Sequence, residues 1–301
     1  MMLDSKLLHR TVWRLARTPL APILKGIRRA SVRQHLAHRR RIAGSLPANA
    51  LARSLAQELR EQGWCTVTDL VDPALLQSLS KAAESKMHRD QQADVKQQIG
   101  HKDFWTRLLD EDKVDGVLPT DNPFVAFALQ APILQLLCAF YGEVPFLDDV
   151  LLTLSKHTGK KLALSQLWHR DYDDVRTVKL FVYLTDVKDK DDGPFTFIPG
   201  PESDRLGSSL RSRREDSEID ARVGQTGIRQ MVAPRLSVFL VETSRCLHMG
   251  SRVGQGHQRL LYTAGYISVP RMYPEPPARF RTVGGESEAI RCLLDPGLRR
   301  G

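Results

Sequence analysis

The pattern His-x-Asp occurs three times in the chain, beginning at His88, His101 and His169. Imidazole nitrogens and carboxylate oxygens are common ligands of divalent transition metals, so each occurrence is a candidate metal site. On a β-strand, residues i and i+2 project from the same face, whereas on a helix they diverge by about 200°. We therefore expect a metal site only where the pattern meets a strand.

The third occurrence has this context. His169 and Asp171, in "LWHRDYDDV", immediately precede the strongest β-forming run of the sequence. The pattern at His88 falls in a polar helical stretch, and we predict solvated surface residues there. The pattern at His101 falls in a loop between helices without a later partner at useful spacing, and we predict surface residues there too.

The later part of the chain supplies further ligands. The apolar run "LSVFLVET" is followed by His248, a glycine-rich turn and Arg259, eleven residues after His248. Two histidines and one carboxylate on adjacent strands form a facial triad, which is typical of Fe(II) and leaves three coordination positions open. A 2-oxoacid would occupy two of these and O2 the third. We expect Arg259 to bind the distal carboxylate of 2-oxoglutarate in a bidentate pair.

Residues near these ligands are candidates for lining the substrate pocket. Gln166 and Trp168 precede His169 on the same segment, and Trp168 either walls the site or packs in the core. Lys179, Phe181 and Tyr183 alternate along one face of the next predicted strand. Alternation alone does not say whether that face is the inner one.

The elements that must position these side chains change character near Gly142. Before it, the sequence predicts a helix after Ser45, a strand at Trp64 to Val67, a helix beginning at Pro73 and a helix over residues 123–141. From about residue 145 to about 270, short β-rich runs alternate with clusters of Asp, Gly and Pro. Several strands without intervening helices indicate an antiparallel sandwich or small barrel.

Composition limits the class of protein. The 301 residues, 42% hydrophobic and 26% charged, are enough to bury one large core or two moderate ones. The four cysteines form no CxxC pair, which indicates reduced thiols and argues against a cysteine-ligated zinc site. The sequence contains neither a signal-peptide core nor an apolar run of the roughly 20 residues that span a bilayer. We expect a cytoplasmic protein.

The net charge of +9 is concentrated at the N-terminus. Residues 1–43 hold eleven Lys or Arg and one acid, whereas the remainder carries 33 basic and 34 acidic residues. We therefore divide the chain into a basic amphipathic arm, residues 1–44, and a folded domain, residues 45–301. For the arm we favour a peripheral position on an anionic membrane surface. The alternatives are a mitochondrial import signal, a nucleic-acid tail and a structural cap on the barrel.

The segment "WHRDYDDVRTVKLFVYLTDVKDKDDGPFTFIPG", together with Leu247-His248 and Arg259, resembles the phytanoyl-CoA dioxygenase-like family of Fe(II)/2-oxoglutarate oxygenases. The stretch "LREQGWCTVTDLVDPALL" is similar to the start of that family, and the resemblance covers about residues 50 to 270. It implies a mainly β fold with flanking helices, a double-stranded β-helix (jelly roll, cupin-like). It also implies that His169, Asp171 and His248 bind Fe(II) and that Arg259 binds 2-oxoglutarate, with O2 as cosubstrate.

The implied reaction releases succinate and CO2 while an aliphatic carbon is hydroxylated. Together with the arm, this predicts a small-molecule, lipid or lipid-linked sugar substrate, such as an envelope glycolipid. The chain departs from the family after Gly200, where relatives often continue Ser-His and this sequence has Pro201-Glu202. The charged segment 201–227 that follows is a solvated loop or a lid, and we favour the loop. The resemblance to the family does not imply that this chain acts on a CoA ester.

Residues at single positions argue against three other functions. A protein-kinase catalytic loop needs Asn where Arg176 stands, and the chain has no glycine-rich phosphate loop. Nucleic-acid repair oxygenases carry a second Arg where Gly265 stands, so a nucleic-acid partner is not expected. Related halogenases replace the carboxylate ligand with a small residue, whereas Asp171 retains it and favours hydroxylation. The remaining alternative is a non-catalytic metal-binding or scaffold protein on the same fold.

Overall fold

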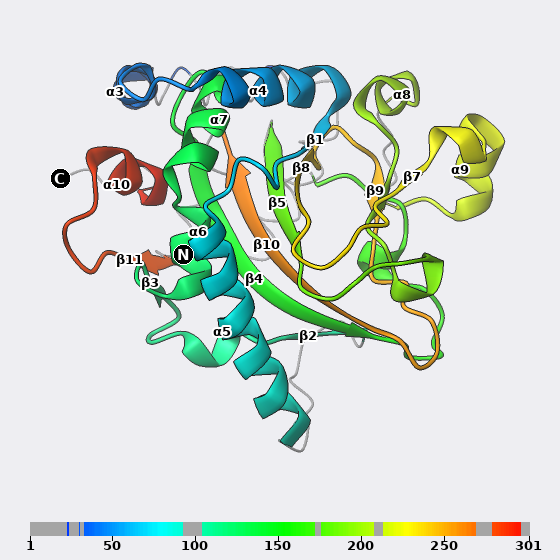
Figure 1. The fold of residues 1–301 in the computed structure, drawn as a ribbon. Coiled ribbons are helices and arrows are strands. Elements are labelled where there is room, and N and C mark those ends of the chain that lie inside the picture. The colour runs from blue at the N-terminus through cyan, green and yellow to red at the C-terminus, as the bar shows by residue number, and fades with distance from the viewer. Residues whose placement is uncertain are drawn as a thin grey trace, which may run out of the picture.

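The computed structural model describes residues 23, 30, 33–92, 104–171, 176–207, 213–268 and 279–295. At its centre lies an antiparallel sheet of six strands, which we call the major sheet (Figure 1). In spatial order its strands are β1 (Trp64–Thr66), β8 (Val238–Glu242), β5 (Thr177–Tyr183), β10 (Gln258–Ile267), β4 (Phe146–Lys156) and β2 (Trp105–Arg107).

A second, smaller sheet faces one side of the major sheet. Its strands are β7 (Arg229–Gln230), β6 (Thr196–Phe197) and β9 (His248–Met249), and we call it the minor sheet. Aromatic side chains of both sheets share one buried cluster, in which Phe181 and Phe239 contact Phe195, and Phe195 contacts Phe197. Two facing antiparallel sheets confirm the predicted sandwich-like β core. The isolated bridges of Trp168 with Arg214 and of His169 with His248 extend the minor sheet.

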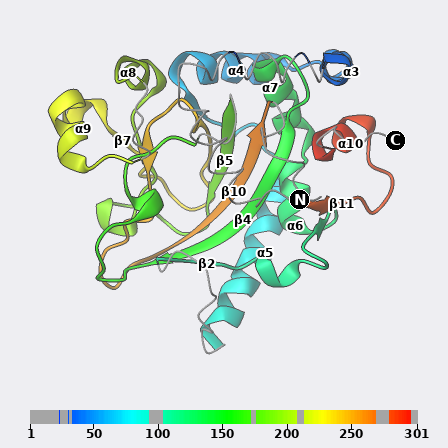
Figure 2. The same cartoon turned by 180° about the vertical axis from the view of Figure 1, so that it is seen from behind.

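Helices cover the other side of the major sheet, as the two opposite views show (Figures 1 and 2). They share the largest core cluster with side chains such as Leu152, Val178, Leu240 and Tyr262. These helices are α4 (Ala50–Gln62), α5 (Pro73–Gln92), α6 (Pro123–Ala128) and α7 (Ala131–Tyr141). The pattern at His88 lies within α5, as predicted, whereas that at His101 lies outside the described residues.

The helix predicted over residues 123–141 is in fact two helices, which is a correction. Pro132 occupies the first turn of α7, where its missing N–H costs nothing, but inside one long helix its ring would clash with the carbonyl of Ala128. The side chain of Gln130 uses the break, since it donates to Phe127 O at 2.8 Å and accepts from Asp72 N at 2.9 Å.

Alternation along the strands gives the major sheet two different faces. Leu260 and Tyr262 of β10 face the helices, whereas Leu261 belongs to the aromatic cluster between the sheets. We call the face turned toward the minor sheet the inner face. Phe181 and Tyr183 lie on it, so the strand face that alternation left undecided is the inner one.

The folded body begins earlier than Ser45. Helix α3 (Arg33–Gly44) buries Leu36, Arg39 and Ile42, and Arg39 donates to main-chain carbonyls at the start of β4 and in the C-terminal helix α10 (Glu288–Leu294). The body therefore extends at least to Arg33. The preceding arm lies almost entirely outside the described residues, which include only Ile23 and Ala30 of it.

The remaining elements are short. Strands β3 (Leu118–Pro119) and β11 (Phe280–Arg281) pair in parallel. The charged segment 201–227 contains most of α8 (Gly200–Arg205), all of α9 (Asp216–Val223) and the 3-10 turn η4 (Gln225–Gly227). Three further 3-10 turns are η1 (Asp110–Asp112), η2 (Leu164–Gln166) and η3 (Lys190–Asp192). Within the described parts of the chain, no helix has the length and apolar character that a membrane span requires.

Candidate metal centre

The structure brings His169, Asp171 and His248 together, with one potential ligand atom of each residue within 4.8 Å of the others. Backbone hydrogen bonds cause this meeting. His169 N donates to His248 O at 2.9 Å, and His248 N donates to His169 O at 2.8 Å. Asp171 N donates to Thr243 O at 3.0 Å. The three side chains are only 11%, 17% and 5% exposed, so water competes weakly for them.

The two imidazoles are oriented by their own main chain. Nδ1 of His169 lies 2.8 Å from Leu167 O, and Nδ1 of His248 lies 2.9 Å from Cys246 O. A carbonyl only accepts, so each Nδ1 carries the proton and each Nε2 presents a lone pair. Burial lowers the pKa of His169 to about 3 and also lowers the pKa of His248. Both rings are therefore neutral, which is the form that binds a metal.

The carboxylate of Asp171 lies between the two Nε2 atoms. Oδ1 is 4.0 Å from His169 Nε2, and Oδ2 is 3.9 Å from His248 Nε2. Burial opposes ionisation here, but Lys179, whose Nζ lies 2.8 Å from Oδ2, acts together with His248 and His169 to outweigh it, and the pKa of Asp171 lies well below its usual range. Two neutral imidazoles and one ionised carboxylate fit a divalent cation such as Fe(II).

One turn, residues 242–246, holds two of the three ligands. Thr243 O accepts from the backbone of Asp171, and Cys246 O accepts from Nδ1 of His248. Ser244 Oγ accepts from Thr177 N at 2.9 Å, which fixes the turn to the start of β5. A displacement of the 242–246 turn would therefore move Asp171 and His248 at once.

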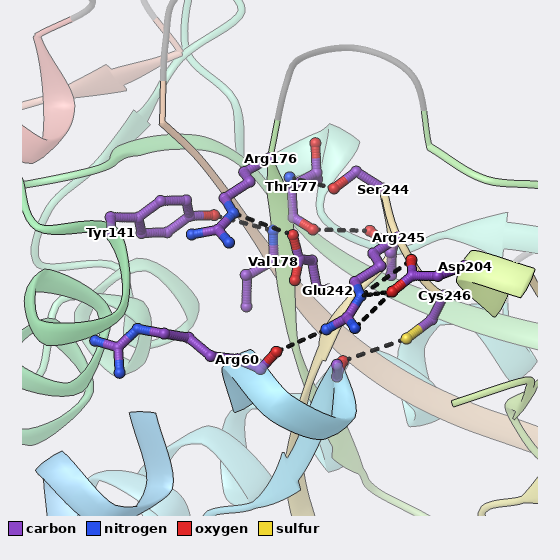
Figure 3. Close-up of polar contacts among 12 residues, drawn as sticks. Arg60, Tyr141, Arg176, Thr177, Val178, Asp204, Glu242, Ser244, Arg245 and Cys246 are labelled. Atoms are coloured by element: carbon purple, nitrogen blue, oxygen red, sulfur yellow. Dashed lines mark hydrogen bonds and ion pairs between the residues drawn. The ribbon is translucent and has the colours of Figure 1, made fainter. Parts of the chain in front are cut away.

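Two arginines brace this turn, one on either side of Glu242 (Figure 3). Nε of Arg176 lies 3.3 Å from Oε1 of the buried Glu242. Arg245 donates to Arg60 O at 2.7 Å, at the end of α4, and its Nη2 lies 2.7 Å from Asp204 Oδ2. Burial raises the pKa of Glu242. The turn is thus connected to β5, α4 and α8 by charged groups.

Arg259 lies on the inner face, opposite Ser155 of β4, and is 1% exposed. Its Nη1 donates to Gly193 O and its Nη2 donates to Ser251 Oγ at 3.1 Å. Its Nε is buried without a partner, and no carboxylate among the described residues forms an ion pair with it. A buried cation without a counter-ion is costly, so this guanidinium suits an anionic ligand such as a carboxylate.

A short path links Arg259 to the metal ligands. The rings of Phe195 and His248 are 5.4 Å apart between centroids. A β-carbon on Gly250 would lie 3.8 Å from Phe195 Cδ2 and 3.9 Å from Arg259 Nη2. Gly250 therefore lies close both to the Arg259 guanidinium and to the aromatic ring that contacts His248.

The two residues considered for the substrate pocket have other contacts. Gln166 is buried, donates to Ser251 O at 3.0 Å and accepts from Ala163 N at 3.2 Å, so it supports the segment that contacts Arg259. Trp168 packs with Ile198, Ile219 and Leu247, and its Nε1 donates to Asp216 Oδ1 at 2.9 Å. Trp168 therefore packs in the core, which is one of the two alternatives that the sequence left open.

Several neighbours of the ligands were not assigned from the sequence. Alternation grouped Lys179 with Phe181 and Tyr183, but only the contact with Asp171 shows that Lys179 reaches the ligands. The sequence of the 242–246 turn did not indicate its role beside the ligands, because the turn acts mainly through backbone carbonyls, which every residue has.

Comparisons with known proteins agree with this geometry. The sequence profile of the family described as "Phytanoyl-CoA dioxygenase (PhyH)" matches residues 59–238, which confirms the resemblance found in the sequence. No curated protein matches the chain as a relative.

Solved structures show the fold. The epimerase SnoN in complex with Fe3+, α-ketoglutarate and nogalamycin RO is 16% identical, with a TM-score of 0.53 over 75% of this chain and 87% of that chain. EctD from S. alaskensis with 2-oxoglutarate and 5-hydroxyectoine is 15% identical, with a TM-score of 0.53 over 78% of this chain and 88% of that chain. The jelly-roll fold expected from the sequence is thereby confirmed.

Proposed function

Because the chain belongs to the phytanoyl-CoA dioxygenase family, we propose that it is an Fe(II)- and 2-oxoglutarate-dependent oxygenase that hydroxylates an aliphatic carbon. O2 is the second cosubstrate, and succinate and CO2 are the coproducts. The observation that carries the proposal is the meeting of His169, Asp171 and His248, with both Nε2 atoms presented and the carboxylate ionised.

The residues have distinct roles in this proposal. His169, Asp171 and His248 hold the iron, which supplies the oxidising chemistry when it is bound with 2-oxoglutarate and O2. Arg259 binds the distal carboxylate of 2-oxoglutarate through a charge-assisted pair. Asp171 favours hydroxylation over halogenation, because it fills a coordination position that a halide would need. Lys179 holds the Asp171 carboxylate in place.

The test is iron- and 2-oxoglutarate-dependent turnover. Under anaerobic conditions, adding Fe(II) and 2-oxoglutarate should produce a weak visible charge-transfer band, and adding air should produce succinate. The alternative, a non-catalytic metal-binding or scaffold protein on the same fold, predicts no succinate under any condition. Incubation with cell extract, followed by untargeted mass spectrometry for a gain of one oxygen atom, then searches for the product among small molecules, lipids and lipid-linked sugars.

The N-terminal arm supports a second, independent proposal, that the protein lies in the cytoplasm and associates peripherally with an anionic membrane surface. Residues 1–32 hold seven Lys or Arg and one acid, interspersed with apolar residues. Because α3 packs into the body, the test variant should lack residues 1–32 and keep α3.

Full-length protein should sediment with anionic vesicles and the variant should not. Salt should weaken the binding, since charge attraction is screened over about 8 Å at physiological ionic strength. Equal sedimentation would contradict it.

A further inference from the structure

The inner face of the major sheet carries charged side chains beyond those already assigned. Lys179 pairs with Asp171, and Arg259 suits 2-oxoglutarate. Arg107 of β2 and Asp149 of β4 remain. Neither contacts the metal ligands, and neither has a role in the proposed handling of iron or 2-oxoglutarate.

Arg107 lies at the edge of the inner face. It is paired in register with Thr153 of β4, which is paired in turn with Leu261 of the aromatic cluster. Directly paired residues project from the same face of a sheet, so Arg107 projects toward the minor sheet. Its Nε is buried without a partner, and within the described residues its guanidinium forms no hydrogen bond or ion pair.

Asp149 lies farther along the same face, in the row that also contains Lys179. Gly265 of β10 is paired with Asp149 on one side and with Lys179 on the other. A β-carbon on Gly265 would lie only 2.5 Å from Asp149 Oδ1, so the carboxylate lies over the glycine, on the inner face. Oδ1 is buried, and the side chain has no hydrogen-bond or ion-pair partner among the described residues.

Unpaired charges on this face need an explanation. Arg107 and Asp149 are both partly exposed, but one atom of each, Arg107 Nε and Asp149 Oδ1, is buried without a partner among the described residues, which costs about 1–3 kcal/mol per atom. Glu242 and Arg214 also have an unbonded buried atom, but each has an ion pair elsewhere on the side chain, with Arg176 and Glu218 respectively. Arg259 and Arg170 each donate to main-chain carbonyls. Within the described residues, Arg107 and Asp149 have neither kind of contact. Such groups are retained where a ligand completes them.

From this arrangement we infer the class of the substrate, an inference that rests on the proposed function. The substrate is polar and ionised: an acidic group, carboxylate or phosphate, binds the Arg107 guanidinium, and a hydroxyl or ammonium group donates to the Asp149 carboxylate. Asp149 and Thr153, the partner of Arg107, are four residues apart on β4, or about 13 Å along the strand. The two side chains therefore anchor different parts of one molecule. An unsubstituted acyl chain would satisfy neither.

The experiment measures succinate formed by the full-length, iron-loaded protein at saturating 2-oxoglutarate. Cell extract is divided into an anion-exchange-retained fraction, an unretained aqueous fraction and an organic-solvent fraction. We expect the retained fraction to stimulate succinate formation. Arg107→Gln and Asp149→Asn should each reduce that stimulation at least about tenfold, the loss of one charge-assisted hydrogen bond. The matched controls, Arg222→Gln and Asp69→Asn, remove the same charges from exposed positions and should respond like wild type.

Two further readings separate this inference from other roles. Because neither side chain bonds within the described chain, neither substitution should lower the thermal midpoint, whereas a structural role predicts a loss. Neither should change the 2-oxoglutarate requirement of the slow turnover without substrate. A raised requirement in Arg107→Gln would assign Arg107 to the cosubstrate and overturn the inference. Stimulation by only the unretained or organic fraction, or variants that respond like the controls, would overturn it too.

If no fraction stimulates turnover, inorganic sulfate serves as the anion probe. Titrated into protein loaded with Mn(II) and saturating 2-oxoglutarate, sulfate should bind wild type at least about tenfold more tightly than Arg107→Gln. Equal binding would contradict the role of Arg107. Failure of the proposed function looks different, because wild type would then give neither the charge-transfer band nor succinate.

Discussion

Two arginines of this protein are almost completely buried, and their surroundings differ. Arg39 of α3 is satisfied at every nitrogen: Nε donates to Val144 O at 2.7 Å, Nη1 to Cys292 O at 2.6 Å and Nη2 to Pro145 O at 2.5 Å. Arg259 of β10 donates through both Nη atoms, but its Nε has no partner. Burial is equal in the two cases, whereas hydrogen bonding is complete in only one.

The difference separates structural from functional charge. The guanidinium of Arg39 also stacks over Phe146, 3.5 Å from the ring centroid, so its contacts do not indicate a ligand site. It joins α3, β4 and the C-terminal helix. The incomplete partners of Arg259 resemble those of Arg107 and Asp149 on the same inner face. Arg39, whose nitrogens are all paired, joins parts of the fold, whereas Arg259, Arg107 and Asp149 on the inner face each keep a buried atom without a partner among the described residues.

The largest expected effect is on the ligand side. Asp171→Ala should reduce iron-dependent succinate formation by more than about a hundredfold, because it removes a metal ligand and the ionised partner of Lys179. The fold should persist, since the backbone bond to Thr243 O does not need the carboxylate. Succinate release and thermal unfolding measure the two effects, and full activity in this variant would rule out the assigned metal centre.

On the structural side, Arg39→Met should lower the free energy of unfolding by about 3–5 kcal/mol, because it leaves several buried carbonyls without donors. Chemical denaturation checks the loss. The protein that remains folded at low temperature should keep its 2-oxoglutarate requirement. A changed requirement would show that α3 influences the site and would weaken the comparison.

Arg259→Gln should give the opposite pattern. Loss of a charge-assisted pair of about 1.5–3 kcal/mol should raise the 2-oxoglutarate requirement about tenfold to a hundredfold. Stability should hold or rise, because the substitution removes a buried cation without a counter-ion. Steady-state titration of 2-oxoglutarate and denaturation are the measurements. Unfolding as severe as in Arg39→Met, with an unchanged requirement, would place Arg259 among the structural residues.

Glu242→Gln tests the brace behind the ligands. It weakens the pair with Arg176, so the 242–246 turn should hold Asp171 and His248 less firmly. We expect metal affinity to fall about tenfold, as for other groups that orient metal ligands, measured by Mn(II) titration. The matched control is Glu84→Gln, which removes an exposed ion pair with Arg235, a residue distant from Glu84 in the sequence. Equal metal affinity in both variants would show that the brace is dispensable.

The smallest effect concerns pH. In metal-free protein the pKa of His169 is lowered to about 3, so between that value and the ordinary 6.5 the unfolded chain binds a proton that the folded chain does not. Stability therefore falls as pH falls through this window, by about 0.8 kcal/mol for this residue between pH 8 and pH 6. His169→Gln should flatten the slope measured by denaturation. A slope that is the same in both proteins would contradict a neutral, buried His169.

The sequence by itself determined much of this protein. Local signals set several elements: Asn49 caps α4, Gly63 ends it in the left-handed conformation, and Pro73 begins α5. These signals act within one turn of chain, so they can be recognised without the fold. The spacing of His169, Asp171, His248 and Arg259 likewise indicated the chemistry, because ligand types and strand alternation restrict what such a set can bind.

Tertiary structure decided what depends on residues distant in sequence. Whether Lys179 faces the ligands or the helices, and whether Trp168 walls the site or packs in the core, depends on which face of a sheet another layer covers. The burial of Arg39 in the body depends on carbonyls more than 100 positions away. The unpaired state of Arg107 and Asp149 depends on cross-strand register and on what the facing layer leaves unbonded. No local pattern records such contacts, because a side chain's type does not state which partners the folded chain brings to it.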